Sequence, residues 1–96
     1  MWLTFEALFG IPDHHDLLLI RSRSRGGLMP GAYWTHDEVD QSGTVIARYE
    51  SYNEVDHNGL VQCGWRKYDS LGQLVDEQSI PEHWSGEPRW WPQLAA

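Results

Sequence analysis

The chain has 96 residues, of which 41% are hydrophobic, and its 14 acidic against 7 basic side chains give a formal net charge of -7. This length supports one domain, residues 1–96, with one modest hydrophobic core. The negative charge argues against direct nucleic-acid binding, which needs a basic surface. A single cysteine, Cys63, excludes an intramolecular disulfide and fits a reducing compartment.

No stretch approaches the ~20 apolar residues of a membrane span. The first apolar stretch follows no basic residues and contains Glu6, which argues against a secretory signal. We therefore expect a soluble, cytoplasmic protein without membrane contacts.

Residues 1–10 are predicted to form a short helix. Thr4 is suited to cap its N-terminus, and Gly10 followed by Pro12 ends it. Its apolar side would consist of Trp2, Phe5, Leu8 and Phe9. An opening strand is the alternative.

Residues 13–16, Asp-His-His-Asp, contain groups that bind divalent metals. A metal site would need further ligands from His36, His57 or His83, and adjacent residues of a strand point to opposite faces. We expect a solvated polar turn instead, and no metal or cofactor.

Residues 17–25 change from an apolar run into alternating arginine and serine. This pattern predicts that a buried strand over Leu17 to Ile20 emerges at the surface. Its exposed end would carry Arg21, Arg23 and Arg25, whose charges discourage edge-to-edge aggregation. Residues 26–31 form a loop without phosphate-binding spacing.

One turn pattern, Asp-x-x-Gly, occurs three times, at residues 40–43, 56–59 and 69–72. The aspartate can cap a type I turn, and the glycine accepts the positive φ that follows it. The pattern predicts a mainly β fold: an antiparallel meander of four to five strands that can curve into a half-barrel. Four of the strands are expected at residues 33–39, 44–55, 60–68 and 73–79, within a meander that spans 33–80.

The register follows if each aspartate lies opposite the residue after its glycine. One face is then a core made of Val39, Val45, Ala47, Tyr49, Val55, Val61, Cys63, Trp65 and Val75. The other face carries two rows of aromatic and charged side chains. The first row is Trp34, Glu50, Arg66 and Asp76, and the second is His36, Arg48, Tyr68 and Leu74.

Residues 64–74, Gly-Trp-Arg-Lys-Tyr-Asp-Ser-Leu-Gly-Gln-Leu, resemble the hairpin of MORN-type and tyrosine-aspartate repeats. The other two copies share only the turn. Because those families use the motif as scaffold, the resemblance implies β-hairpins and no catalytic residue.

Residues 81–96 form a tail that contains Trp84, Trp90 and Trp91 together with prolines that forbid a long helix. An irregular segment is predicted. It either folds back over the sheet or docks on a partner through its indoles.

The sequence contains no nucleophile motif and no nucleotide loop. An acid-base pair of His36 with Glu38, Glu50 or Asp76 is conceivable, but such cross-strand pairs are ordinary in sheets. We expect a non-enzymatic module that binds a protein partner, with a basic partner favoured by the negative charge. We also expect the chain to form a homodimer. The expected binding residues are Trp34, His36, Arg48, Glu50, Tyr52, Arg66, Tyr68, Trp84, Trp90 and Trp91. The alternatives are an acidic inhibitor that mimics nucleic acid and a small-ligand-binding β-barrel.

Overall fold

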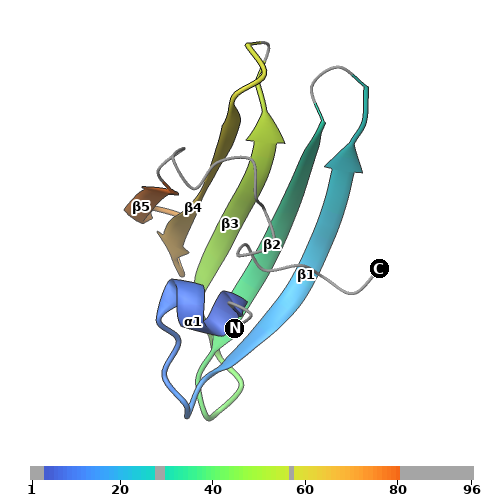
Figure 1. The fold of residues 1–96 in the computed structure, drawn as a ribbon. Coiled ribbons are helices and arrows are strands. Elements are labelled where there is room, and N and C mark those ends of the chain that lie inside the picture. The colour runs from blue at the N-terminus through green and yellow to red at the C-terminus, as the bar shows by residue number, and fades with distance from the viewer. Residues whose placement is uncertain (1–3, 28–29, 57, 81–96) are drawn as a thin grey trace.

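The computed structural model describes residues 4–27, 30–56 and 58–80, which form a short helix and one antiparallel sheet (Figure 1). The elements in chain order are α1 (Phe5–Phe9), β1 (Asp16–Arg25), β2 (Gly31–Val39), β3 (Val45–Val55), β4 (Val61–Asp69) and β5 (Leu74–Ile80). The strands are ordered β1-β2-β3-β4-β5, so each one pairs with its neighbours in sequence. The predicted meander is confirmed, and the apolar and arginine run of residues 17–25 supplies its fifth strand.

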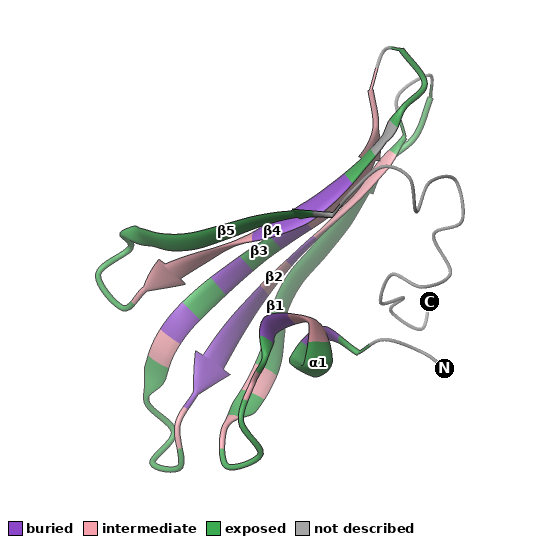
Figure 2. Cartoon of the chain, turned by 60° about the vertical axis from the view of Figure 1, so that its left-hand side comes forward, coloured by how far each residue is buried: buried purple, intermediate pink, exposed green. Residues whose placement is uncertain are grey.

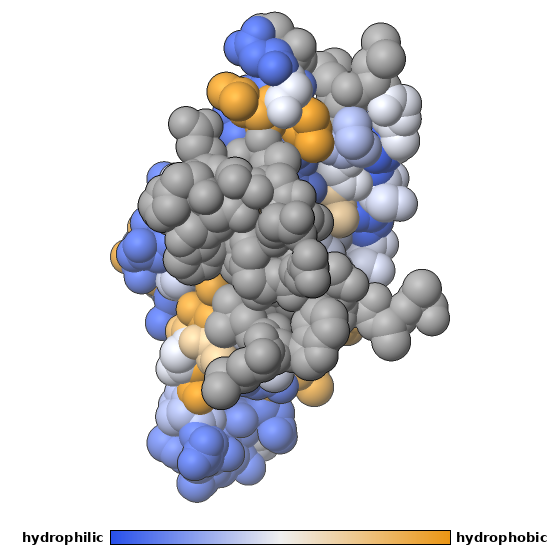
Figure 3. Space-filling view, in the orientation of Figure 1, coloured by the Kyte–Doolittle hydropathy of each residue, from blue (hydrophilic) through white to orange (hydrophobic). Residues whose placement is uncertain are grey.

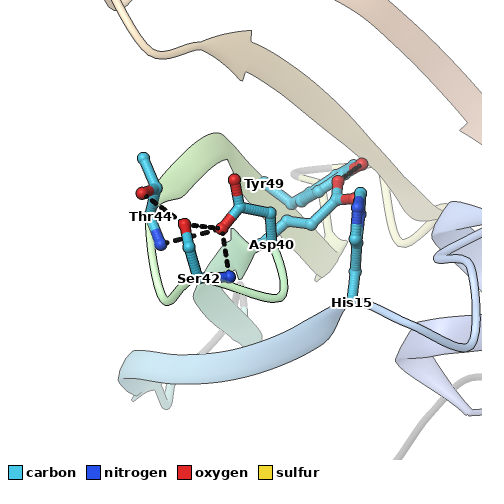
Figure 4. Close-up of polar contacts among 6 residues, drawn as sticks. His15, Asp40, Ser42, Thr44 and Tyr49 are labelled. Carbon is cyan, nitrogen blue, oxygen red and sulfur yellow. Dashed lines mark hydrogen bonds and ion pairs between the residues drawn. The ribbon is translucent and has the colours of Figure 1, made fainter.

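The three Asp-x-x-Gly turns share one geometry. In each turn the glycine amide donates to the aspartate carbonyl, over 3.0, 2.9 and 3.0 Å. The glycines have φ of 85, 79 and 83°, a left-handed region that favours residues without a Cβ. Figure 4 shows the first turn, in which the Asp40 carboxylate accepts from the Ser42 hydroxyl at 2.6 Å and from the Thr44 amide at 3.0 Å. These bonds favour the ionised carboxylate and hold the pKa of Asp40 below its usual value.

Helix α1 packs against one face of the sheet, which we call the inner face (Figure 2). The Thr4 side chain accepts from the Ala7 amide at 3.0 Å, and Gly10 ends the helix with a φ of 70°. The predicted N-cap and C-cap are thus confirmed. The core formed between helix and sheet consists of Phe5, Phe9, Trp34, Ala47, Tyr49, Cys63 and Trp65.

Three bulges interrupt the strand register. They leave Ile20, Ile46 and Val75 without a partner on the neighbouring strand. Side chains of a strand alternate between the two faces, so one unpaired residue shifts the pairing beyond it by one position. Residues that would share a face in a regular pairing then lie on opposite faces. The bulges therefore decide which residues share a face with the core.

The register between β3 and β4 is the predicted one, since Glu50 lies opposite Arg66 and Arg48 lies opposite Tyr68. The predicted pairing is wrong at the outer strands, because the bulges shift it by one residue. Thr35 lies opposite Glu50 in the place expected for Trp34, and Asp37 lies opposite Arg48 in the place expected for His36. Trp34 and His36 instead face the helix and are buried.

On β5 the same shift applies. Glu77, and not the expected Asp76, lies opposite Arg66. Asp76 lies opposite Lys67.

The predicted core is correct for Val39, Ala47, Tyr49, Cys63 and Trp65, which are all buried. It is wrong for Val45 and Val75, whose exposed fractions are 44% and 53%. Val55 is half-buried, and the side chain of Val61 lies outside the described residues.

The expected buried strand over residues 17–20 is also corrected. Leu17 packs against the core, but Leu18, Leu19 and Ile20 are about half exposed. One reason is that β1 is an edge strand with no described neighbour on its other side. In addition, Leu18 lies opposite Asp37, on the face of the sheet turned away from α1.

Strands β1 and β5 are the two edges of the described sheet, which does not close into a barrel. In the space-filling view, apolar side chains are visible on the α1 side, and hydrophilic ones cover the end that carries the β2–β3 turn (Figure 3). Within residues 4–27, 30–56 and 58–80, no helix is long and apolar enough to span a membrane.

Candidate functional site

The face of the sheet turned away from α1, which we call the outer face, carries charged and aromatic side chains in rows that cross the strands. Cross-strand pairing sets these rows, because side chains of directly opposed residues lie next to one another. One row is Arg21, Thr35, Glu50, Arg66 and Glu77. The row on one side of it is Arg23, Tyr33, Tyr52, Gly64 and Ser79, and the row on the other side is Leu18, Asp37, Arg48, Tyr68 and Leu74.

A groove of about 400 Å³ lies on this face over β1 to β4. Arginines line it from both sides, Arg21 and Arg23 from β1 and Arg66 from β4. Tyr33 and Tyr52 line its middle.

Both tyrosines of the groove lie over glycines. A Cβ on Gly31 would lie 2.8 Å from the Tyr33 hydroxyl oxygen, and a Cβ on Gly64 would lie 2.7 Å from the Tyr52 hydroxyl oxygen. The absence of these two side chains gives the rings room to lie along the sheet. The Arg23 guanidinium lies 5.1 Å from the Tyr33 ring centre and that of Arg66 lies 5.3 Å from the Tyr52 ring centre, within the range of cation–π attraction.

Most charges of the outer face are paired. Arg48 binds Asp37 through two bonds of 2.8 and 3.1 Å, and Arg66 donates to Glu77 over 2.7 Å. The Tyr33 hydroxyl donates to Glu54 over 2.5 Å, and this bond raises the pKa of Tyr33 because it stabilises the protonated phenol.

Arg21 and Arg23 differ from the other arginines of this face. Neither forms an ion pair with a carboxylate of the described residues. The groove therefore has two guanidiniums whose charge no described carboxylate neutralises.

A second polar cluster lies at the inner face. The Glu38 carboxylate is buried, accepts from the Tyr49 hydroxyl at 2.8 Å and lies 2.5 Å from His15 Nδ1 (Figure 4). Burial, together with the bond to Glu38, raises the pKa of Tyr49. The solvated turn expected at residues 13–16 is thus corrected for His15, whose imidazole lies largely buried against Glu38.

His36 does not form the acid-base pair considered from the sequence. Its imidazole packs against Phe5 and Phe9, at 4.4 and 5.9 Å from their ring centres, and its Nδ1 has no hydrogen-bond partner among the described residues. Burial lowers the pKa of His36, because an apolar environment disfavours the imidazolium. The sequence held no signal for the His15–Glu38 pair, because the two residues are joined only through the pairing of β1 with β2.

The structure brings together five of the predicted binding residues on the outer face: Arg48, Glu50, Tyr52, Arg66 and Tyr68. Trp34 and His36 lie in the core, and Trp84, Trp90 and Trp91 lie outside the described residues. Four further residues line the groove on this face and were not predicted from the sequence: Arg21, Arg23, Tyr33 and Glu54. The alternation of arginine and serine was the available signal, but the bulge at Ile20 decides the face to which the arginines point.

Two further predictions concern cysteine and metal. Cys63 is buried as expected, and burial raises the pKa of its thiol to about 11, which keeps the thiol protonated at neutral pH. Within the described parts of the chain, no group of three or more histidine, cysteine, aspartate or glutamate side chains is arranged to hold a metal ion.

Comparison with known proteins finds no family model that matches the chain, and it finds no significant match among curated proteins or solved structures.

Proposed function

We propose that this chain is a non-enzymatic protein-interaction module and that the outer face of the sheet is its binding face. The observation that carries the proposal is the groove between Arg21 and Arg66, in which Tyr33 and Tyr52 lie along the sheet with arginines beside their rings. Tyrosine and arginine are among the residues most enriched in the energetically dominant contacts of protein interfaces.

The two faces of the sheet differ in a way that supports this proposal. The core that α1 covers lies entirely at the inner face, so the outer-face side chains near the groove are not needed to shield it. The outer face is also held by ion pairs across strands, which fix its side chains before a partner arrives. Such preorganisation lowers the entropic cost of binding.

The alternatives have less support. A mimic of nucleic acid would gather carboxylates on one face, whereas Glu77 and Asp37 of the outer face are each bound to an arginine. A ligand-binding barrel would need a closed sheet, whereas the described strands form an open one. The net charge of -7 attracts a basic protein at long range, so a basic partner remains a prediction.

Site-specific photo-cross-linking in the cells that make the protein tests the binding face. A photoreactive amino acid replaces Glu50 or Tyr68 on the outer face, and a matched control replaces Gln41, which is exposed in the first turn. We expect one protein adduct from both outer-face positions and none from Gln41. The proposal fails if the outer-face positions give no adduct, or if Gln41 gives the same adducts.

We also propose that the chain forms a homodimer through β5. This edge strand is open in the described sheet, and near it Leu71, Leu74 and Val75 have exposed fractions of 82%, 52% and 53%. A two-fold pairing would cover both the edge and these apolar side chains. Sedimentation at micromolar concentration is expected to show a dimer that Leu74→Lys with Val75→Lys converts to a monomer. A single 11.1 kDa species at all concentrations contradicts the proposal.

A further inference from the structure

We propose that the open edge of β1 binds an extended acidic segment of a partner protein, which adds to the sheet as a further strand and places its carboxylates against Arg21 and Arg23. This inference rests on the proposed function, because it names the chemistry of the partner at the outer face.

The first observation is the edge itself. Within the described residues β1 pairs only with β2, along nine residue pairs from Asp16↔Val39 to Arg25↔Gly31. The opposite side of β1 therefore presents backbone N–H and C=O groups that an added strand would satisfy. Addition of a peptide strand to such an edge is a common mode of recognition.

The second observation is the spacing of charge along this edge. The bulge at Ile20 turns Arg21, Arg23 and Arg25 to the outer face, where they lie opposite Thr35, Tyr33 and Gly31. Side chains at every second position of a strand lie roughly 6.8 Å apart, and an added strand has the same spacing. Carboxylates at alternate positions of that strand would thus face successive arginines as cross-strand pairs.

The third observation is that no carboxylate of the described residues neutralises the charges of Arg21 and Arg23. The nearby carboxylates are engaged elsewhere. Glu54 accepts from the Tyr33 hydroxyl, and its Oε2 lies 3.7 Å from Arg25 Nη2, while Glu77 is bound to Arg66. No described carboxylate forms an ion pair with Arg21 or Arg23, although the chain carries a net charge of -7. Carboxylates of a partner would supply charge-assisted hydrogen bonds at both positions.

Contact with the Tyr33 ring orders the Arg23 side chain before a partner binds. The guanidinium of Arg23 lies 5.1 Å from the ring centre, and the ring is held in turn by its bond to Glu54. A side chain that is ordered before binding loses less entropy when its partner arrives.

The same charges exclude other occupants. A basic strand would be repelled by the arginines, and a neutral strand would leave them unpaired. An acidic segment is therefore the occupant that these arginines favour at the edge, and it can belong to a partner whose overall charge is basic.

Fluorescence anisotropy with labelled octapeptides tests the charge pattern. The test peptide alternates glutamate and threonine. The comparison peptides alternate glutamine and threonine, or lysine and threonine. We expect the acidic peptide to bind about tenfold more tightly than the neutral glutamine peptide. Equal binding of the acidic and neutral peptides, or tighter binding of the basic peptide or of a single-stranded oligonucleotide, overturns the inference.

Variants of the protein locate the contact. Arg21→Gln with Arg23→Gln is expected to weaken binding of the alternating acidic peptide about tenfold and to reduce its dependence on salt. The matched control Lys67→Gln removes a positive charge at β4, opposite Tyr49 on the inner face and outside the groove, and is expected to leave the affinity within about twofold. Circular dichroism confirms that both variants fold, since Arg21, Arg23 and Lys67 do not belong to the core cluster. Equal loss in the two variants overturns the placement at β1.

Peptide N-methylation tests strand addition. Two peptides carry N-methyl groups on alternate residues in opposite phase, so that only one of them blocks the amides that would face β1. One peptide should lose binding and the other should keep it, and equal behaviour overturns strand addition. If cross-linking at Glu50 or Tyr68 captures a protein while no acidic peptide binds, this inference fails and the proposed function stands.

Discussion

The inner and outer faces of the sheet are built from the same strands, yet different interactions stabilise them. At the inner face, Phe9 stacks on Tyr49 with ring centres 4.3 Å apart and meets the edge of Trp65 at 5.3 Å, in a buried cluster. At the outer face, exposed guanidiniums bind carboxylates, as Arg66 does with Glu77. Burial of apolar surface contributes far more to folding than exposed ion pairs do. The stability of the fold therefore depends mainly on the inner face.

The largest expected effect comes from emptying the inner face. Trp65→Ala removes a buried indole that contacts Phe9 and Tyr49, and it should lower the free energy of unfolding by about 3 to 5 kcal/mol. The matched outer-face change Glu50→Ala should cost only ~0.2 to 1 kcal/mol. Urea denaturation of the two variants measures both values. Equal losses would show that the two faces do not differ as described.

A second, smaller effect tests how closely the outer-face tyrosine packs on the backbone. A Cβ on Gly64 would lie 2.4 Å from the Gln78 carbonyl oxygen and 2.7 Å from the Tyr52 hydroxyl. Because the carbonyl belongs to the neighbouring strand, Gly64→Ala should cost about 1 to 3 kcal/mol.

Gly31→Ala is the matched control for this prediction. The nearest atom to its Cβ would be the Tyr33 hydroxyl oxygen at 2.8 Å, at the end of a side chain that can move. We expect a smaller loss of stability for Gly31→Ala in the same denaturation experiment. A loss as large as that of Gly64→Ala would show that both tyrosine rings are held rigidly.

The contrast between the faces also explains which parts of the structure could be predicted from the sequence. The turns are local, since Asp40 and Gly43 form their turn through their own side chain and backbone. The turn at Asp56 to Gly59 fixes the β3–β4 register because no bulge interrupts the pairing of these two strands. The helix was predictable for the same reason, since Thr4 and Gly10 cap it locally.

The bulges were not predictable, because no residue type marks Ile20, Ile46 or Val75 as unpaired. Each is a branched apolar residue that fits a regular strand equally well. Tertiary packing selects the bulge at Ile46, since it lets Trp34 and His36 pack on Phe5 under the helix. The predicted row across the strands was therefore correct at Glu50 and Arg66 and wrong at Trp34 and Asp76.

The turns give the third effect. Gly72 has a φ of 83°, and no heavy atom lies within 4 Å of the place that a Cβ would take. Gly72→Ala should therefore cost about 1 to 2 kcal/mol through backbone conformation alone. Gly26 also has open space around it but no positive φ, so Gly26→Ala should be neutral or slightly stabilising. Thermal unfolding of both variants checks the difference, and a loss at both positions would contradict a conformational cause.

The smallest effect is a pH dependence that belongs to the inner face. Burial lowers the pKa of His36, and only the charge of Glu6 opposes this shift. When the pH falls below the unfolded value of about 6.5, the unfolded chain binds a proton that folded His36 does not yet accept. The contribution of neutral His36 to the free energy of unfolding is therefore fully present above this pH. It is lost as the pH falls toward the lower pKa of folded His36.

Urea midpoints measured between neutral pH and mildly acidic pH test this dependence. His36→Leu should flatten the fall in stability on acidification, because leucine binds no proton in either state, even if the variant is less stable throughout. His14→Gln serves as the control, since His14 is exposed and its loss should leave the wild-type profile in place. If His36→Leu keeps the full wild-type dependence, burial of His36 is not its cause.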